Sequence, residues 1–153
     1  NMARKDKSLG VDVRIVDTGV LNSKSIKSNT LDYCESFEIY VSTKHNERIS
    51  DLNFGIRIDA SDGSPILSAL SGEQDVYISS KKETEVKIKF NGLYLVPGSY
   101  FLTCSVRKNG QFIDELIDCL EFEISDVPFE QFKPHNGAWG PVKFFPNWQI
   151  NGE

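Results

Sequence analysis

The chain has 153 residues, of which 39% are hydrophobic and 25% are charged; this is the length of one ordinary domain, and the composition excludes a disordered or fibrous protein. The 22 acidic residues outnumber the 17 lysines and arginines, and the net charge of −5 argues against a nucleic-acid partner or an anionic lipid surface. No apolar run approaches the roughly 18 residues of a membrane-spanning helix, so direct membrane insertion is not expected.

Apolar and polar residues alternate along most of the chain with a period of two, which predicts half-buried β-strands. In chain order, the runs predicted as strands are residues 11–16, 37–42, 54–59, 66–70, 76–78, 86–90, 100–107 and 120–124. Asn109-Gly110, between the last two runs, predicts a tight hairpin. Seven or eight strands at this spacing predict an all-β fold, an immunoglobulin-like antiparallel β-sandwich.

Three further segments are not predicted as strands. Residues 23–30, rich in serine, lysine and asparagine, predict a solvated loop, and residues 114–119 are the best helical candidate but are too short to matter. Residues 70–74, Leu-Ser-Gly-Glu-Gln, come within one residue of the LSGGQ signature of ABC-transporter ATPases. Because the sequence has no G-x-x-x-x-G-K-[ST] loop to hold nucleotide phosphates, we interpret this segment as a hairpin turn with Gly72 at its bend.

The cysteines and histidines predict neither a metal site nor a cofactor. Cys34, Cys104 and Cys119 form no C-x-x-C pair, and we expect free thiols that fill the core of a protein in a reducing compartment. The alternative is an immunoglobulin-type disulfide between Cys34 and Cys104, which would indicate an extracellular module. His45 and His135 have no neighbours at metal-ligand spacing.

The densest acidic group near a strand edge is formed by Asp114, Glu115 and Asp118. Paired carboxylates act as catalysts only where their surroundings separate their pKa values. We therefore interpret these residues as solvated charge, and we do not expect the chain to be an enzyme.

Two strands in the middle of the chain predict a binding face. If Phe54, Ile56 and Ile58 point inward, the residues between them point outward, and the same holds for residues 100–107. The residues predicted to share the outer face are Arg57, Asp59, Phe101, Thr103, Ser105 and Arg107. An aromatic ring, hydroxyls, a carboxylate and two guanidinium groups provide the apolar contact and the planar hydrogen bonding that a sugar needs. The alternative is an ordinary polar sheet face with one stray aromatic residue.

The last 25 residues differ from the rest of the chain, because both tryptophans and three prolines fall there. Prolines exclude a central strand across most of this segment. Either the segment packs its aromatic residues on its own sandwich, or it docks on a partner as an arm exchanged between identical chains. The candidate arm residues are Trp139, Val142, Phe144, Phe145 and Trp148. The chain thus divides into an expression scar and linker (1–9), a sandwich (10–128) and an aromatic C-terminal arm (129–153).

Short motifs resemble those of the C-terminal domain of the Wzt-type nucleotide-binding subunit of ABC transporters that export O-antigen polysaccharide. Residues 95–102, Leu-Val-Pro-Gly-Ser-Tyr-Phe-Leu, are similar to the G-x-Y-x-L strand entry of that family. Asp114 and Asp118, followed by Phe-Glu-Ile at 122–124, resemble its closing strand, and Gly140-Pro141-Val142 with Trp148 resembles its terminal stretch. The resemblance covers the chain from about residue 11 to residue 150.

The resemblance implies a cytoplasmic immunoglobulin-like domain at the inner face of the inner membrane. It would bind finished O-antigen polysaccharide, at its modified non-reducing end, on one sheet face and would couple the glycan to the exporter. It implies a homodimer formed by exchange of the C-terminal strand, an ATPase domain upstream in the full-length chain, and the membrane subunit of the transporter as a partner. The alternative is a generic immunoglobulin-like adhesion or structural module that binds a protein.

Overall fold

The computed structural model describes residues 3–45, 47–80, 82–130, 132–134 and 139–151. Asn1 and Met2, interpreted above as an expression scar, lie outside these ranges, as does His135. The elements, in chain order, are β1 (Val13–Leu21), β2 (Thr30–Tyr33), β3 (Glu38–His45), β4 (Ile49–Ala60), β5 (Pro65–Leu70), the 3₁₀-helix η1 (Ser71–Gln74), β6 (Ile78–Ser80), β7 (Glu83–Lys89), β8 (Leu93–Leu95), β9 (Gly98–Lys108), β10 (Gln111–Pro128) and β11 (Val142–Phe144).

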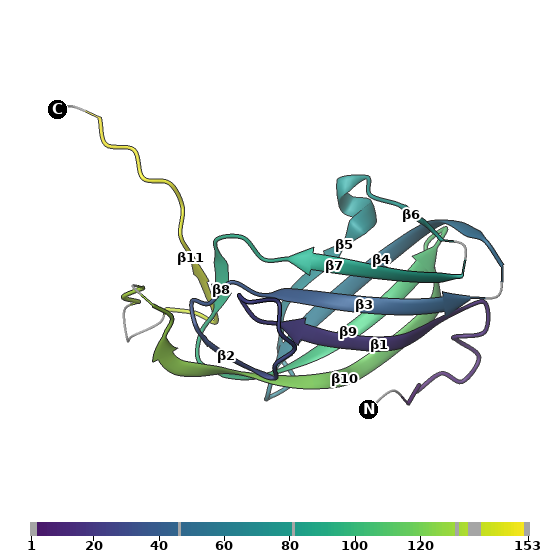
Figure 1. The fold of residues 1–153 in the computed structure, drawn as a ribbon, viewed down its shortest axis with the longest axis horizontal. Helices are drawn as coiled ribbons and strands as arrows, with labels where there is room; N and C mark the ends of the chain where they lie inside the picture. The colour runs from purple at the N-terminus through teal and green to yellow at the C-terminus, as the bar shows by residue number, and fades with distance from the viewer. Residues whose placement is uncertain (1–2, 46, 81, 131, 135–138, 152–153) are drawn as a thin grey trace.

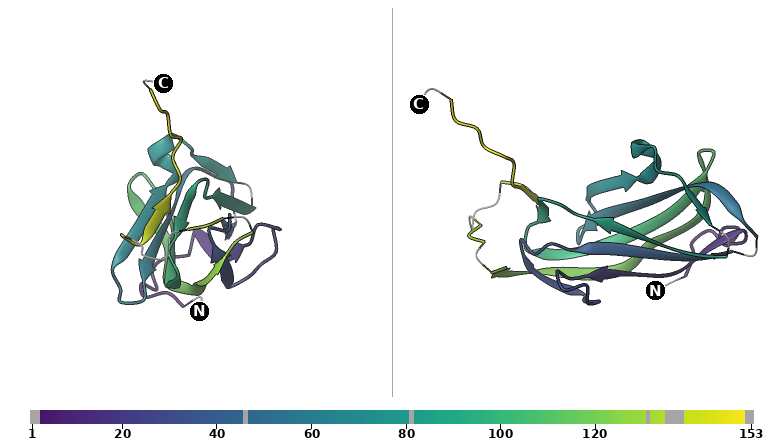
Figure 2. Two further views of the ribbon diagram at one scale, coloured as in Figure 1. Left: turned by 90° about the vertical axis from the view of Figure 1, so that its left-hand side faces the viewer. Right: turned by 45° about the horizontal axis from the view of Figure 1, so that its top comes forward.

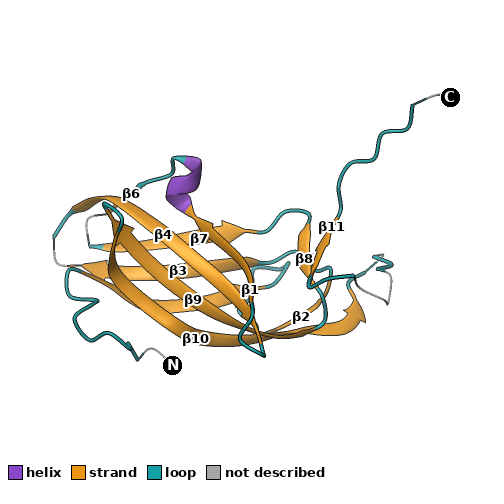
Figure 3. Ribbon diagram, turned by 180° about the vertical axis from the view of Figure 1, so that it is seen from behind, coloured by secondary structure: helices purple, strands orange, loops and turns teal. Residues whose placement is uncertain are grey.

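Two sheets pack face to face and confirm the predicted sandwich. One has the order β1-β3-β7, and the other has the order β2-β10-β9-β4-β5, with β6 also paired to β4. Figure 1 shows the three-stranded sheet in front, and Figure 3 shows the molecule from the side of β4, β9 and β10. A third, small sheet joins β8 to β11.

The core lies between the two sheets and is formed by alternate residues of their strands. On β4, Phe54, Ile56 and Ile58 are buried, and on β9, Leu102 and Cys104 are buried. The residues between them therefore face outward from the sandwich, which is the arrangement that the alternation predicts.

Strand β10 is much longer than predicted, because it includes residues 114–119, the discarded helical candidate. Its pairing with β9 shifts between Phe112 and Asp114 and again between Leu116 and Leu120. Each bulge adds residues to one strand only and so interrupts the period of two. At the second bulge, Asp118 has a positive φ of 50°.

Strand β2 is missing from the prediction, which assigned a loop up to residue 30. It is short and pairs in parallel with β10, with Leu31 opposite Ile124. The sandwich is therefore antiparallel with one parallel pair at its edge, and Leu31 and Tyr33 contribute to the core.

The interpretation of residues 70–74 as a hairpin turn is wrong. Both β5 and β6 run antiparallel to β4 along the same edge, with Leu70 opposite Gly55 and Ile78 opposite Leu52. The chain does not reverse at Gly72 but makes one turn of 3₁₀-helix between the two strands. This turn is held by Asn53, whose Oδ1 accepts a hydrogen bond of 2.9 Å from the Gly72 N–H.

Asp114 is not solvated, contrary to the prediction, but is fully buried. Its Oδ1 accepts a 2.7 Å hydrogen bond from Nε of Arg4, and its Oδ2 accepts a 2.6 Å bond from Nη2 of the same residue. The backbone N–H groups of Ile15 and Glu115 also donate to this carboxylate. A residue of the predicted linker thus joins the N-terminal segment to β1 and β10.

All three cysteines are buried, and Cys34 and Cys104 form no disulfide. Sγ of Cys104 lies 4.0 Å from Sγ of Cys119, so its neighbouring thiol is on β10. The hydrogen bond with Cys119 and the burial of the group raise the pKa of the Cys104 thiol, and burial raises the pKa of the Cys34 thiol. These two thiols therefore stay protonated at neutral pH.

Candidate functional site

The outer face of the larger sheet brings together the polar residues of β4 and β9. The two strands are neighbours, and their register places Arg57 opposite Thr103, Gly55 opposite Ser105, and Asn53 opposite Arg107. The residues predicted to share one outer face therefore lie on two neighbouring strands.

A hollow of about 260 Å³ opens on this face. Four of the six predicted residues line it. Its lining comprises Gly55, Ile56, Arg57, Ser68, Leu70, Thr103, Ser105, Arg107 and Glu115. A Cβ atom on Gly55 would lie 2.6 Å from Cδ2 of Leu70 and 2.7 Å from Oγ of Ser105. Glycine at position 55 therefore lets these two side chains pack over the backbone without filling the hollow.

Asp59 holds the guanidinium group of Arg57. Nε of Arg57 donates to both oxygens of the Asp59 carboxylate, at 3.0 and 3.1 Å. The Asp59 side chain is 8% exposed, whereas that of Arg57 is 46% exposed. The buried carboxylate fixes the direction of the guanidinium group, and the terminal nitrogens of Arg57 make no hydrogen bond within the described part of the chain. Asp59 thus contacts Arg57, and it is not in the lining of the hollow.

Phe112 holds the second guanidinium group. The central carbon of the Arg107 guanidinium lies 4.3 Å from the centroid of the Phe112 ring, which is a cation–π contact. Nε of Arg107 is buried and has no hydrogen-bond partner among the described residues. A buried donor without an acceptor is costly, and Nε itself is closed to a ligand because it has almost no accessible surface.

The three hydroxyl groups of the hollow come from two strands, β5 and β9. Oγ1 of Thr103 accepts a 3.1 Å hydrogen bond from the backbone N–H of Asp118, at the β10 bulge, and its O–H remains a donor. Ser68 lies on β5 opposite Arg57, and Ser105 lies on β9 opposite Glu115. The site thus offers donors on both sides and one carboxylate acceptor.

Phe101 does not line the hollow. It is half-buried on the same sheet face, opposite Asp59 on β4 and Glu121 on β10. The Phe101 ring, predicted to be part of the binding face, therefore lies outside the hollow that the four polar residues line.

Four lining residues, Gly55, Ser68, Leu70 and Glu115, are not among those predicted from the sequence. Ser68 and Leu70 belong to a predicted strand whose partner had not been assigned, and their register opposite Arg57 and Gly55 is the signal that was lacking. Glu115 was interpreted as part of an acidic surface group, because the bulges hide its place opposite Ser105.

Comparison with known proteins identifies the family. The family model of the Wzt C-terminal domain matches residues 10–143. The chain belongs to this family. A solved structure described as the crystal structure of the C-terminal domain of Wzt has a TM-score of 0.70 at 16% identity, with 92% of this chain and 84% of that chain covered. The match confirms the fold.

Other solved structures are more distant. A β-glucosidase from Listeria innocua in complex with gluconolactone has a TM-score of 0.42 at 14% identity, over 74% of this chain and 16% of that chain. The CARDB domain of the PF1109 protein from Pyrococcus furiosus has a TM-score of 0.39 at 14% identity, over 75% and 96%. No curated protein matches the chain.

Membership of the Wzt C-terminal domain family supports a carbohydrate-binding role in O-antigen export. Members of the family are non-enzymatic binding domains that belong to a transporter nucleotide-binding subunit. This membership favours glycan binding over the alternative of a generic adhesion module. Within the described ranges, no helix has the length and apolarity that crossing a membrane would require.

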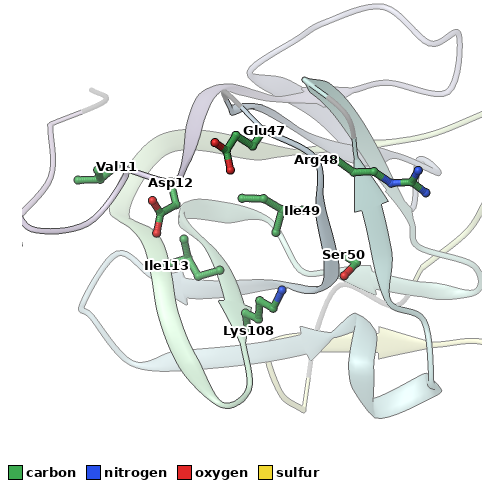
Figure 4. A pocket seen from close by; sticks show the side chains of 8 residues that line it. All are labelled: Val11, Asp12, Glu47, Arg48, Ile49, Ser50, Lys108 and Ile113. Atoms are coloured by element: carbon green, nitrogen blue, oxygen red, sulfur yellow. The ribbon is translucent and has the colours of Figure 1, made fainter.

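The chain has a second, roomier hollow at the end of the sandwich, with a volume of about 480 Å³. None of the predicted site residues lines it. Figure 4 shows the Arg48 side chain pointing away from the other lining residues. The lining carries charges of both signs, since Glu47 and Asp12 are acidic and Lys108 is basic. No aromatic ring is among the described residues that line it. The hollow beside Arg57 and Arg107 is therefore the better candidate site.

One part of the C-terminal arm contacts its own chain, and another part exposes aromatic side chains. Val142 pairs with Leu95 in the small sheet, and the Phe145 ring lies 5.4 Å from that of Tyr94. Trp139 and Trp148 are exposed, and Phe144 is 61% exposed. Beyond β11 the chain extends away from the sandwich (Figures 1 and 2).

Proposed function

We propose that this domain binds O-antigen polysaccharide at its modified non-reducing end, in the hollow between Arg57 and Arg107. One observation carries the proposal: two guanidinium groups, one held by Asp59 and the other by Phe112, line the same hollow together with hydroxyl groups. Planar donors that are fixed before binding suit neighbouring hydroxyl groups of a sugar, because little side-chain freedom is lost when the ligand binds.

Binding without catalysis fits the carboxylates of this site. Hydrolysis of a glycosidic bond commonly uses two carboxyl groups that flank the bond. Among the described residues, Glu115 is the one carboxylate that lines the hollow, and Asp59 is engaged by Arg57. The domain would therefore hold the glycan for export and release it unchanged, without a metal or a cofactor.

The remaining partners follow from the family and belong to the same proposal. The domain would act in the cytoplasm, at the inner face of the inner membrane, tethered to the ATPase domain of its full-length chain and close to the membrane subunit of the transporter. Two copies would pair through the C-terminal arm, whose Trp139 and Trp148 rings are exposed in one chain.

Alanine substitution tests the site. O-polysaccharide purified from the source strain is titrated calorimetrically against the wild type and against Arg57→Ala and Arg107→Ala. Because hydrogen bonds to charged groups contribute about 1.5–3 kcal/mol, each variant is expected to bind about 10- to 100-fold more weakly.

Arg14→Ala is the matched control, since Arg14 is an exposed arginine on β1 in the opposite sheet. It should bind like the wild type, and circular dichroism should show all three variants folded. Wild-type affinity in both Arg57→Ala and Arg107→Ala would exclude this hollow as the glycan site.

A further inference from the structure

A third hollow lies beside the proposed glycan site on the same sheet. Its volume is about 360 Å³, and it is lined by Asp51, Asn53, Tyr77, Asn109 and Gly110. These residues come from the start of β4, the segment between η1 and β6, and the β9–β10 hairpin. Nothing in the proposed function assigns a role to this hollow.

One residue pair connects the two hollows. Asn53 lines the third hollow, and it lies directly opposite Arg107, which lines the proposed site. Gly55, which also lines the proposed site, is two residues further along β4, a distance of roughly 7 Å. A ligand that filled the proposed site and continued past Arg107 would enter the third hollow.

The groups in the third hollow are those that bind a sugar. Tyr77 is 54% exposed, a high value for an aromatic residue that the fold does not need for its core. The Tyr77 hydroxyl and the Asn53 amide nitrogen converge, since both lie within 3.1 Å of the point where a Cβ of Gly72 would stand. Because Oδ1 of Asn53 is held by the Gly72 N–H, this amide presents its nitrogen as a donor.

We propose that this hollow is a second sugar subsite, in which Tyr77 stacks on a ring of the same polysaccharide and Asn53, Asp51 and Asn109 bind its hydroxyl groups. The inference rests on the proposed function. Recognition then extends beyond the terminal residue to a sugar further along the chain, and affinity increases with the length of the glycan until both hollows are filled.

A chain-length series tests the subsite. O-polysaccharide from the source strain is cleaved by mild acid, and fragments that keep the non-reducing end are separated by size and titrated calorimetrically. The wild type should bind the longer fragments about 10-fold more tightly than the shortest that binds. Tyr77→Ala should lose this gain and keep the affinity for the shortest fragment, whereas Tyr77→Phe should retain the gain if stacking supplies it.

Two further variants complete the experiment. Asn109→Gly removes the amide and keeps a residue that tolerates the positive φ of 52°, so it should lose part of the gain without disturbing the hairpin. Val76→Ala is the control, because Val76 is exposed next to Tyr77 and does not line the hollow. Wild-type affinity of Tyr77→Ala for long fragments would overturn the subsite and leave the first site standing. No binding of any fragment by the wild type would overturn the proposed function and the subsite together.

Discussion

The carboxylate of Asp114 accepts four hydrogen bonds, two from Arg4 and two from the backbone of Ile15 and Glu115. Both members of this ion pair are buried, with 6% exposure of the Arg4 side chain and none of Asp114. Removing one partner of a buried pair leaves the other charge without compensation in a medium of low polarity. The pair therefore fixes the N-terminal segment on β10 one residue before Glu115, which lines the glycan site.

Arg4→Ala is expected to lower the free energy of unfolding by about 3–5 kcal/mol, because it leaves the buried Asp114 carboxylate without a positively charged partner. Urea unfolding of the full chain measures the loss. Asp126→Ala is the control: Asp126 is an exposed carboxylate on the same strand, and its removal should change stability by less than about 0.5 kcal/mol. A loss for Arg4→Ala as small as that of the control would mean that the pair adds nothing to the fold.

The outer face of β4 depends on a residue that has no side chain. A methyl group on Gly55 would meet the ends of two flexible side chains, Leu70 and Ser105, which can turn aside. They would turn into the hollow, so Gly55→Ala should keep the fold and weaken glycan binding by about 10-fold or more. Gly140→Ala serves as the matched control, since a Cβ there meets no atom within 4 Å.

Calorimetric titration with the source-strain polysaccharide and thermal unfolding of both variants separate the two effects. Unchanged affinity in a folded Gly55→Ala variant would show that the space above residue 55 is not used by the glycan.

The strands with unbroken alternation were predictable from the sequence, and the interrupted ones were not. On β4 and β9 every second residue is apolar, so the outward direction of Arg57, Thr103 and Arg107 followed from the period alone. On β10, bulges at two places shift the phase, and the buried Asp114 was interpreted as solvated.

The register between neighbouring strands could not be predicted from the sequence either. The place of Leu70 over Gly55 depends on how β5 aligns with β4, and the place of Tyr77 depends on a 3₁₀ turn held by the Asn53 side chain. Such contacts between residues far apart in the chain leave no periodic signal in either segment.

At the scale of the whole molecule, the arm is attached to its own sandwich by few contacts. Strand β11 pairs with β8 through three residues, from Val142 to Phe144, and the arm residues Phe132 and Phe145 both pack on Tyr94. Trp139, Trp148 and Ile150 are each more than 80% exposed. Large exposed aromatic side chains favour an interface, and the same strand pairing can form with β8 of a second copy without new geometry.

The 153-residue chain is therefore expected to show twice the mass of one chain in size-exclusion chromatography with light scattering, and a chain that ends at Pro134 should be a monomer. Because that truncation also removes Phe145 from Tyr94, it could unfold the domain. Trp139→Ser combined with Trp148→Ser keeps β11 and removes only exposed rings, so this variant should remain folded and shift toward the monomer. Phe112→Ala, which removes an aromatic ring at the far hairpin, should leave the mass unchanged. A dimer that persists after deletion of the arm would show that the two copies pair through another surface.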